Sequence, residues 1–353
     1  MQQTNQIDEL LKLLTYPAFS VHDGTVTHVN SAAYQRQISP GTEIAHLLHT
    51  GKDAYDAFTD GRLHLQLCVA DTVWNASVTK AMGADIFLLE NTADSQELRI
   101  LSLAALQFRF PLAEIALLTD KLFNDEALKG SDIPERLNRS LMTMQRLIGN
   151  MSDAPRYSRN ANCAMQNRDI VAFIEEILEK CKALAEESGY KLELIIPVRE
   201  LFVSFSPERL ERAIYNMLSN ALKFSPVGST ITAKLEKCKD VVMFTVSDEG
   251  PGLPENVTGN IFTRYLREPV IEDSRFGMGL GMMLVCATAS AHGGTVLVRQ
   301  PKGKGLSVTM TLLAKPGNPG DIRSNIIHVD YSGGHDHALL ELSDALSPEL
   351  YKK

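Results

Sequence analysis

The chain has 353 residues, a net charge of -8 and 44% hydrophobic residues. This length suggests two or three domains with separate cores, and the acidic balance argues against a nucleic-acid partner. The five cysteines are scattered and never spaced as Cys-x-x-Cys, which favours a reducing cytoplasm over a disulfide framework or a zinc site. No basic start with an apolar run follows Met1, and the apolar stretch 278–291 is short and broken by glycines, so we expect neither a signal peptide nor a membrane span.

Residues 1–93 alternate short strand-like runs with turns, which predicts a small antiparallel α+β domain. The segment AFSVHDGTVTHVN at 18–30 has two β-type runs around Asp23-Gly24, a hairpin signal. Further strand candidates lie at 63–69, 74–82 and 84–90.

Residues 94–155 predict two amphipathic helices joined by a short loop. In the first helix the apolar seam is Leu101, Ala105, Phe108, Leu112, Ile115 and Leu122; in the second it is Leu137, Leu141, Met144, Ile148 and Met151. Such a helical hairpin is typical of a dimeric four-helix bundle; packing of the two helices on the chain's own domain is the alternative. Pro111 lies inside the first helix, where it removes one backbone hydrogen bond, so a kink or a helix boundary is expected there.

The polar stretch 153–168 is interpreted as a linker to an α/β domain assigned to 160–315. Its expected helices begin at Asp169 and at Ser206-Pro207. Its expected strands lie at 191–196, 201–204, 230–236, 241–247, 294–299 and 306–313. A C-terminal extension, 316–353, follows; Asp336 in it is interpreted as a helix cap, with a metal site that includes Asp330, His335 and His337 as the weaker alternative.

Three polar residues share one face of the helix that carries NMLSNALKFSP at 216–226: Asn216, Asn220 and Lys223. Two amides and an ammonium on one stripe can hold a hydrated Mg²⁺ and phosphate oxygens. Taken alone, the stripe is more often an ordinary solvated helix face.

The strand 241–247 runs into DEGPGLP. A carboxylate at the end of a strand, Asp248, can accept a hydrogen bond from an exocyclic amine such as that of adenine. Gly250 and Gly252 let the backbone turn and approach a flat ligand. A simple Gly-Pro turn is the alternative.

Two further segments complete the pattern. RFGMGLGMMLV, which begins at Arg275, places Gly277, Gly279 and Gly281 at the start of a helix, where backbone amides attract phosphate. Arg264 and Arg267, in IFTRYLRE, can reach phosphates. Each segment is weak evidence alone, but their order is a strong joint signal.

This order resembles the ATP-binding domain shared by sensor histidine kinases, DNA gyrase, Hsp90 and MutL, in its histidine-kinase branch. NMLSNALKFSP looks like the N box, DEGPGLP the first glycine box, IFTRYLRE the F box and GMGLGMMLV the second glycine box. AHGGTVLV and GKGLSVTMTLL look like the closing strands of the family, so the resemblance covers about residues 165–315.

The resemblance implies ATP and Mg²⁺ as cofactors. By position, Asn220 would bind Mg²⁺, Asn216 and Lys223 would lie near the phosphates, and Asp248 would read the adenine amine. The glycines that would let the backbone meet the nucleotide are Gly250, Gly252, Gly277, Gly279 and Gly281, and the two arginines of the mobile lid are Arg264 and Arg267. Hydrolytic relatives carry a general-base Glu where Asn216 stands, so phosphoryl transfer or plain binding is expected rather than ATP hydrolysis.

The first helix of the hairpin resembles the histidine-kinase motif His-Glu-Leu-Arg-Thr-Pro-Leu in the stretch LQFRFPL. The matching positions are Arg109, Pro111 and Leu112, so the proline is interpreted as the family's kink. The mismatches are Leu106 at the phosphoacceptor His, Gln107 at the acid and Phe110 at the hydroxyl. Leucine has no nucleophilic atom, and no histidine of this chain lies between His64 and His292.

We therefore expect a multidomain α/β chain. The expected parts are a PAS-like sensor domain at 1–93, whose opening hairpin matches AFSVHDGTVTHVNSAA, a hairpin at 94–155 that forms a dimeric four-helix bundle, a GHKL-type α/β sandwich at 160–315, and an extension at 316–353. The expected function is that of a cytoplasmic, homodimeric, histidine kinase-like regulator that binds ATP and Mg²⁺, lacks the acceptor histidine and acts through its bundle on a response regulator or other signalling protein. The alternative is an active kinase that phosphorylates a partner or an acceptor outside the bundle.

Overall fold

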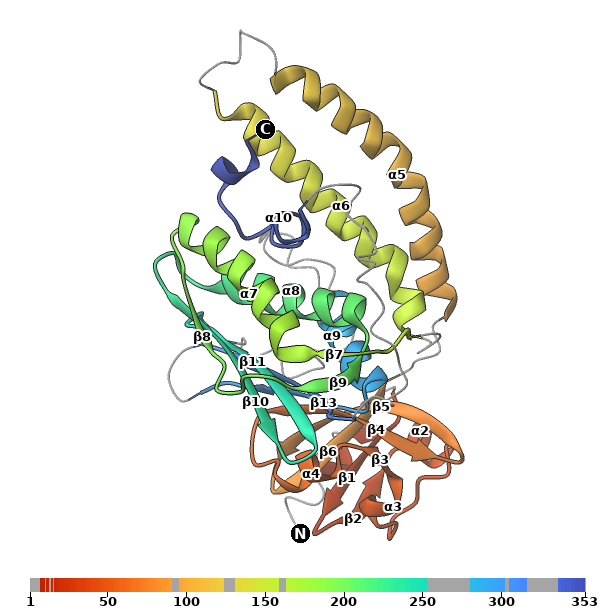
Figure 1. Cartoon of the computed structure of the whole chain (residues 1–353). Coiled ribbons are helices and arrows are strands. Elements are labelled where there is room, and N and C mark those ends of the chain that lie inside the picture. The colour runs from red at the N-terminus through yellow and green to blue at the C-terminus, as the bar shows by residue number, and fades with distance from the viewer. Residues whose placement is uncertain are drawn as a thin grey trace.

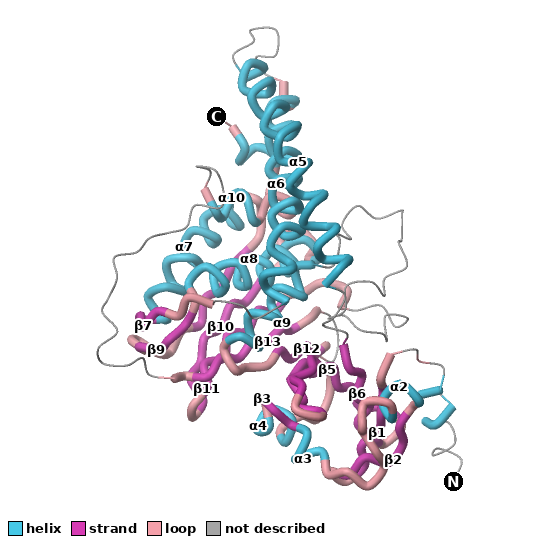
Figure 2. The backbone as a smooth tube through the Cα atoms, turned by 90° about the vertical axis from the view of Figure 1, so that its right-hand side faces the viewer, coloured by secondary structure: helices cyan, strands magenta, loops and turns pink. Residues whose placement is uncertain are grey.

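The computed structural model describes residues 7–9, 11–12, 14, 16–90, 95–123, 131–158, 163–252, 280–301, 305–315 and 336–352. Along the chain, a strand-rich N-terminal domain is followed by a helical hairpin and then by an α/β domain. In space, the α/β domain lies between the N-terminal domain and the hairpin, which projects away from both (Figure 1). The view in Figure 2 shows the same hairpin standing on the α/β domain, with the N-terminal domain at the opposite end.

The N-terminal domain is an antiparallel sheet in the order β2-β1-β6-β5-β4, with β3 beside β4. Its strands are β1 Ala18–His22, β2 Thr25–Val29, β3 Leu48–Thr50, β4 Arg62–Val69, β5 Thr72–Ala81 and β6 Ala84–Glu90, and its short helices are α2 Ser31–Tyr34, α3 Ile44–Leu47 and α4 Lys52–Asp56. The turn at Asp23-Gly24 has positive φ at both residues, as a two-residue hairpin loop requires. Phe19 and Phe87 stack in the core at 4.8 Å between ring centroids. The predicted hairpin and strands are confirmed.

The helical hairpin consists of α5, Ser95–Phe123, and α6, Ile133–Ser158. Helix α5 continues through Pro111, which excludes a helix boundary there. The seam between the helices contains Ala105 and Leu112 from α5 and Leu141, Ile148 and Met151 from α6.

Three residues that the sequence pattern assigned to this seam, Phe108, Ile115 and Met144, are exposed instead. The heptad pattern covers a wider arc of each helix than one partner helix can bury. Part of the apolar surface of the hairpin is therefore left uncovered within one chain.

Helix α5 is also long and apolar enough, over Ile100–Thr119, to cross a membrane by length and composition alone. The expectation that the chain has no segment long and apolar enough to span a membrane, which was drawn from 278–291, is therefore wrong by this criterion. Only 12% of that window is buried inside the structure, and the apolar face of a bundle helix passes the same test.

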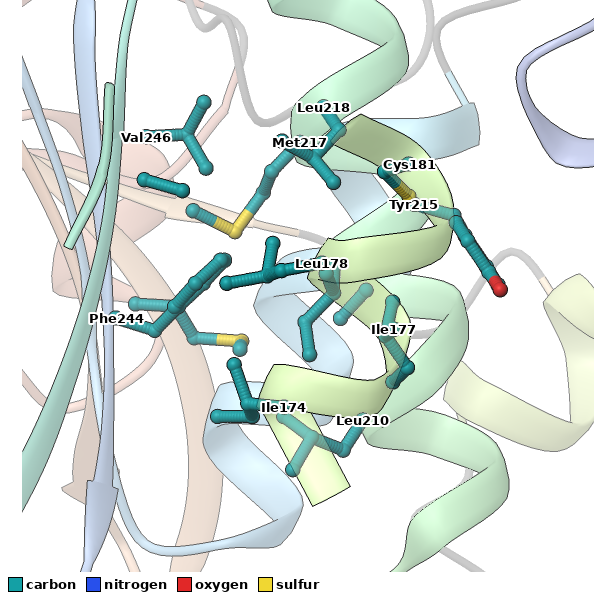
Figure 3. Packing of buried hydrophobic residues seen from close by; sticks show 14 of the residues in the cluster. Ile174, Ile177, Leu178, Cys181, Leu210, Tyr215, Met217, Leu218, Phe244 and Val246 are labelled. Atoms are coloured by element: carbon teal, nitrogen blue, oxygen red, sulfur yellow. The ribbon is translucent and has the colours of Figure 1, made fainter. Parts of the chain in front are cut away.

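In the described residues, the main sheet of the α/β domain consists of β8 Lys191–Ile195, β10 Thr230–Cys238, β11 Val241–Ser247, β12 Val296–Arg299 and β13 Ser307–Leu313, in the order β12-β13-β11-β10-β8. Helices α7 Ile170–Glu187, α8 Pro207–Phe224 and α9 Leu280–Ala291 cover one face. Figure 3 shows side chains of α7 and α8, such as Leu178 and Met217, directed at Phe244 and Val246 of β11. The α/β sandwich expected from the sequence is confirmed.

The predicted linker at 153–168 is wrong at both ends. Helix α6 runs on to Ser158 despite Pro155, and Gln166–Asp169 forms strand β7, which pairs with β9, Phe202–Phe205. Ala154 and Tyr157 are fully buried, which supports the last turn of α6. Apolar contact with the α/β domain thus overrides the polar composition of the stretch.

The two sheets are joined edge to edge, because β12 pairs with β4 of the N-terminal domain. Leu63 of β4 stands opposite Leu297 of β12 in this antiparallel register. Gly51 and Gly61, both at positive φ, lie against Thr295 and Val298, where a Cβ would collide with the neighbouring domain. The two domains therefore form one continuous sheet.

The C-terminal segment, residues 336–352, forms α10, His337–Glu341, and a 3₁₀ turn, Pro348–Tyr351. In Figure 1 it lies between α6 and the helices of the α/β domain. Asp336 Oδ1 accepts hydrogen bonds from the Ala338 and Leu339 amides at 2.8 and 3.0 Å, so its predicted role as a helix cap is confirmed.

Candidate functional site

Helix α8 places the predicted phosphate-facing residues on one side of the domain. Pro207 occupies its first turn, and the helix buries one face in the main core. Asn216 is 1% exposed, its Nδ2 donates to the Arg212 carbonyl at 2.8 Å, and its Oδ1 accepts from Arg146 of α6 at 3.3 Å. Asn220, one turn later, and Lys223 are half-buried. The structure therefore brings the three residues together along α8, as the spacing predicts.

Asp248 follows the end of β11 and is held by its own backbone surroundings. Its Oδ1 accepts hydrogen bonds from the Gly250 amide at 2.8 Å and from the Leu306 amide at 3.1 Å. Burial raises the pKa of Asp248, and these two hydrogen bonds offset only part of that rise. With Oδ1 engaged in this way, Oδ2 is the oxygen available for a ligand.

The glycines near Asp248 and Asn216 are positions of close approach. A Cβ on Gly250 would lie 2.8 Å from the Phe224 carbonyl oxygen and 2.9 Å from Asp248 Oδ1. A Cβ on Gly281, at the start of α9, would lie 2.7 Å from Asn216 Oδ1. Gly252 has φ of 75° and lies against the side chain of Gln300. These contacts place the first glycine segment, α8 and the start of α9 around one site.

Lys223 and its neighbour Ser219 contact a residue that the sequence analysis did not single out. Lys223 Nζ donates to Asp344 Oδ2 at 2.9 Å, and Ser219 Oγ donates to Asp344 Oδ1 at 2.7 Å. Arg146 Nη1 also donates to Asp344 Oδ1. Burial raises the pKa of Asp344, but the charges of Arg146 and Lys223 and the hydrogen bonds from Lys223 and Ser219 outweigh it and hold the pKa below its usual value.

A second carboxylate of the C-terminal segment, Glu341, is almost completely buried between two arginines. Its Oε2 accepts from Arg146 Nε at 3.2 Å, and its Oε1 lies 3.5 Å from Arg212 Nε. Arg212 of α8 also donates to Asn150 Oδ1 at 2.6 Å and to Asp153 of α6. The hairpin, α8 and the C-terminal segment are thus joined by one network of buried charges.

A cavity of about 450 Å³ opens beside this network. Arg136 and Arg139 of α6, Lys223 of α8 and Asp344 lie in its wall. Three cations against one carboxylate make it a place that favours anionic groups.

His292, which follows α9, has a structural role, because both of its ring nitrogens contact the backbone. Its Nε2 accepts the Ser206 amide at 2.9 Å at the start of α8, and its Nδ1 lies 2.7 Å from the Thr288 carbonyl, which only a protonated Nδ1 can satisfy as a donor. Burial, with the charge of Arg209 nearby, lowers its pKa to about 4. The ring is therefore neutral and fixes α9 against α8.

Four residues of the predicted nucleotide site lie outside the described residues: Arg264, Arg267, Gly277 and Gly279. Asp330 and His335, from the alternative of a metal site in the extension, lie outside them too. On α5, Leu106 and Gln107 are exposed; Phe110 is on the same helix, and its side chain is not described. Within the described residues, no group of three or more His, Cys, Asp and Glu side chains could hold a metal ion.

Comparison with known proteins agrees with this geometry. Residues 205–316 match the family model of the histidine kinase-, DNA gyrase B- and HSP90-like ATPases. The hybrid signal transduction histidine kinase D of Dictyostelium discoideum is 30% identical over 225 residues, which are 60% of this chain and 14% of that protein. The adaptive-response sensory kinase SasA of a Synechococcus strain is 27% identical over 223 residues, 61% of this chain and 58% of that protein.

A solved structure, full-length ShkA in complex with AMPPNP, has a TM-score of 0.50 at 21% identity and covers 63% of this chain and 47% of its own, which speaks for the fold. The chain spans about a seventh of the length of the kinase from Dictyostelium and less than two thirds of SasA. Residues 205–316 therefore form a GHKL-type ATPase domain, and the chain is related to the sensor histidine kinases.

Proposed function

We propose that this chain is a histidine kinase-like regulator that binds ATP and Mg²⁺ but does not phosphorylate itself at the usual position. The observation that supports the proposal is Leu106, which aligns with the acceptor histidine of the motif that LQFRFPL resembles and is 52% exposed on α5. Neither α5 nor α6 contains a histidine. A phosphoryl group delivered to this helix would meet no imidazole.

The residues of the site fit a bound nucleotide. Asp248 Oδ2 would accept the adenine amine, while the backbone amides of Gly250 and Leu306 hold Oδ1 in place. Asn220 would bind Mg²⁺, and Asn216 and Lys223 would face the phosphates. The four residues outside the described part, Arg264, Arg267, Gly277 and Gly279, would complete the phosphate contacts. Bound ATP would supply a transferable phosphoryl group, and an amide at 216 offers no base to activate water for hydrolysis.

The hairpin supports a homodimer. Among the side chains of α5 that the structure describes, seven large apolar ones are exposed: Ile100, Leu103, Leu106, Phe108, Ile115, Leu117 and Leu118. An apolar helix face of this extent calls for a partner, and a second copy of the hairpin would complete a four-helix bundle.

The N-terminal domain would be a PAS-type sensor. Its antiparallel sheet, with short helices between β2 and β4, supports this assignment. Because β4 pairs with β12, a change in that domain would reach the ATPase sheet directly. The protein would act in the cytoplasm on a response regulator or another signalling protein, and its net charge of -8 argues against nucleic acid.

Incubation with γ-labelled ATP tests the proposal. We expect the full chain to bind ATP with Mg²⁺ in calorimetry and Asp248→Ala to lose that binding. We expect no acid-labile label in residues 95–158. Label on a partner, or on a tail histidine such as His337, would favour the alternative of an active kinase with an acceptor elsewhere. Full binding retained by Asp248→Ala would refute the assignment of the adenine site.

A further inference from the structure

We propose that the C-terminal segment, residues 336–352, is an autoinhibitory element that occupies the phosphate-facing side of α8 and competes with bound nucleotide. This inference rests on the proposed function, because it assigns Asn216 and Lys223 to the phosphates. The structure provides the competitor: Asp344 lies on Lys223 and Ser219 of the same helix.

The competition follows from the chemistry of the contacts. A carboxylate and a phosphate are both oxyanions that accept charge-assisted hydrogen bonds from ammonium, hydroxyl and guanidinium groups. Asp344 uses both oxygens in this way, Oδ2 with Lys223 and Oδ1 with Ser219 and Arg146. A phosphate that binds Lys223 must displace Asp344 from it, because two anions held at short distance on one ammonium repel each other.

Arg146 extends the contact to the N box itself. Its Nη2 donates to Asn216 Oδ1, while its Nε donates to Glu341 and its Nη1 to Asp344. An arginine held in this way by the C-terminal segment occupies the side-chain oxygen of Asn216. Release of the segment would remove Glu341 and Asp344 from Arg146, so that its guanidinium is no longer held beside Asn216 by these carboxylates.

The segment is docked by more than its charges. Its buried side chains join the main core of the ATPase domain: Ala338, Leu340, Leu342, Leu346 and Tyr351. Arg139 Nε of α6 donates to the Ser343 carbonyl at 2.9 Å, and Asn138 Nδ2 donates to the Tyr351 carbonyl at 3.0 Å. These contacts fix Asp344 in register over Lys223.

The cavity beside Asp344 gives a competing anion an approach. Arg136 and Arg139 lie in its wall together with the Lys223–Asp344 pair. A phosphate group can therefore reach this ion pair without first unfolding the segment. A phosphate that enters from the cavity would first displace Asp344 from Lys223, and the rest of the segment would leave α8 afterwards.

The consequence is a reduced apparent affinity for nucleotide in the docked state. When only a fraction of the protein is competent to bind, the apparent Kd rises by the inverse of that fraction. We expect Asp344→Asn to lower the Kd of AMPPNP with Mg²⁺ at least about tenfold, measured by calorimetry on the full chain.

Two further variants separate docking from simple electrostatics. Leu342→Ser loosens the segment at a fully buried anchor and leaves every charge in place, so it should also lower the Kd. Glu349→Gln removes the same charge as Asp344→Asn at an exposed position of the same segment and should leave the Kd unchanged. Equal tightening by Glu349→Gln would reduce the effect to net charge and overturn the inference.

Hydrogen exchange of the wild-type chain gives a readout that needs no variant. Saturation with AMPPNP and Mg²⁺ should protect amides around Asp248 and accelerate exchange over residues 338–346. Protection around Asp248 with unchanged exchange over 338–346 would show that segment and nucleotide bind together, which overturns the inference but keeps the proposed function. Failure of the wild type and all three variants to bind the nucleotide would overturn both.

Discussion

Arg146 Nη2 of α6 lies 3.3 Å from Asn216 Oδ1 of α8, so a side chain of the helical hairpin directly contacts a residue of the segment that resembles the N box. The same guanidinium bonds Glu341 and Asp344 of the C-terminal segment and is only 7% exposed. The hairpin, the ATPase helix and the end of the chain therefore meet at one residue, and movement of any of them changes the surroundings of the other two.

Replacement of Arg146 tests how far the fold depends on this meeting point. Arg146→Met leaves Asp344 and the buried Glu341 with one cation fewer each, and a broken buried ion pair costs about 3 kcal/mol or more. We expect that loss in the free energy of unfolding from urea denaturation. Arg136→Met is the matched control, because its ion pair with Asp132 at 3.6 Å is exposed, and such pairs contribute about 1 kcal/mol or less. Equal effects of the two substitutions would contradict the assignment.

The network around Arg146 could not be predicted from the sequence, and the physical reason is distance along the chain. Arg146 and Asp344 are 198 positions apart, and neither belongs to a recurring motif. The face of α8 could be predicted, because Asn216, Asn220 and Lys223 repeat with the period of a helix. Local periodicity thus predicted the α8 side of the site, whereas the contact of Asp344 with that side is seen only in the tertiary structure.

The same distinction holds for the sheets and for the linker. The strands were predictable from alternation and turn residues, whereas the pairing of β4 with β12 depends on two glycines that merely look like turn residues. The polar composition of 153–168 did not predict the last turn of α6, because that turn is supported by Tyr157, which is buried with Arg209 of α8 over its ring. The pattern of residues within one segment does not show which distant segment will pack against it.

Asp248→Asn should separate stability from binding. Burial raises the pKa of Asp248 above its unfolded value, so the ionised group costs stability at neutral pH, where the unfolded chain holds the same charge in water. Asparagine keeps an Oδ1 acceptor for the Gly250 and Leu306 amides but turns an NH₂ donor toward the adenine amine. We expect a thermal midpoint at pH 7 that is unchanged or higher, together with at least a tenfold loss of affinity for ATP. A lower midpoint with undiminished binding would contradict this role.

His292 should make stability depend on pH in a defined window. Its pKa is lowered to about 4, while the unfolded value is about 6.5. Between these values the unfolded state binds a proton that the folded state does not, so the free energy of unfolding falls as the pH falls from about 6.5 to about 4, by about 3 kcal/mol in total. Urea denaturation at pH 7.5, 6 and 5 measures it. His292→Gln removes the titrating group and should flatten this part of the curve; an unchanged slope would assign it to other groups.

The exposed face of α5 should hold two chains together. Leu103 and Leu117 are two heptads apart and therefore on the same face, and both are among the most exposed apolar residues of the helix. We expect light scattering to report twice the chain mass of 38.9 kDa for the wild type and a monomer for Leu103→Gln/Leu117→Gln. Val227→Gln, at an exposed position after α8, is the control and should stay dimeric. A monomeric wild type at micromolar concentration would remove the argument for a four-helix bundle.

Restoration of a histidine at position 106 tests the proposal that α5 keeps the fold of the motif and lacks only its reactive residues. Helix α5 is continuous through Pro111, and Arg109 Nη2 donates to Ser152 Oγ of α6 at 3.4 Å, so the register around position 106 is set by the fold. The exposed Leu106 can become histidine at a cost within about 0.5 kcal/mol. We expect Leu106→His/Gln107→Glu to acquire acid-labile label from γ-labelled ATP, because the pair supplies the missing nucleophile and its acid–base partner.

The control for this experiment is Ala113→His, which places a histidine at another exposed position of α5, one heptad after 106, without the motif around it and outside the apolar side chains assigned to the dimer. It should stay unlabelled, as should the wild type over residues 95–158. Since the docked C-terminal segment would slow any transfer, both variants are also made with Asp344→Asn, where the label should increase only in the chain that carries His at 106 and Glu at 107. A chain that binds ATP yet stays unlabelled with the pair restored would show that α5 has lost more than its reactive residues. Label on the wild-type hairpin, with Ser102 and Thr119 as the first candidates, would show instead that the bundle uses another acceptor.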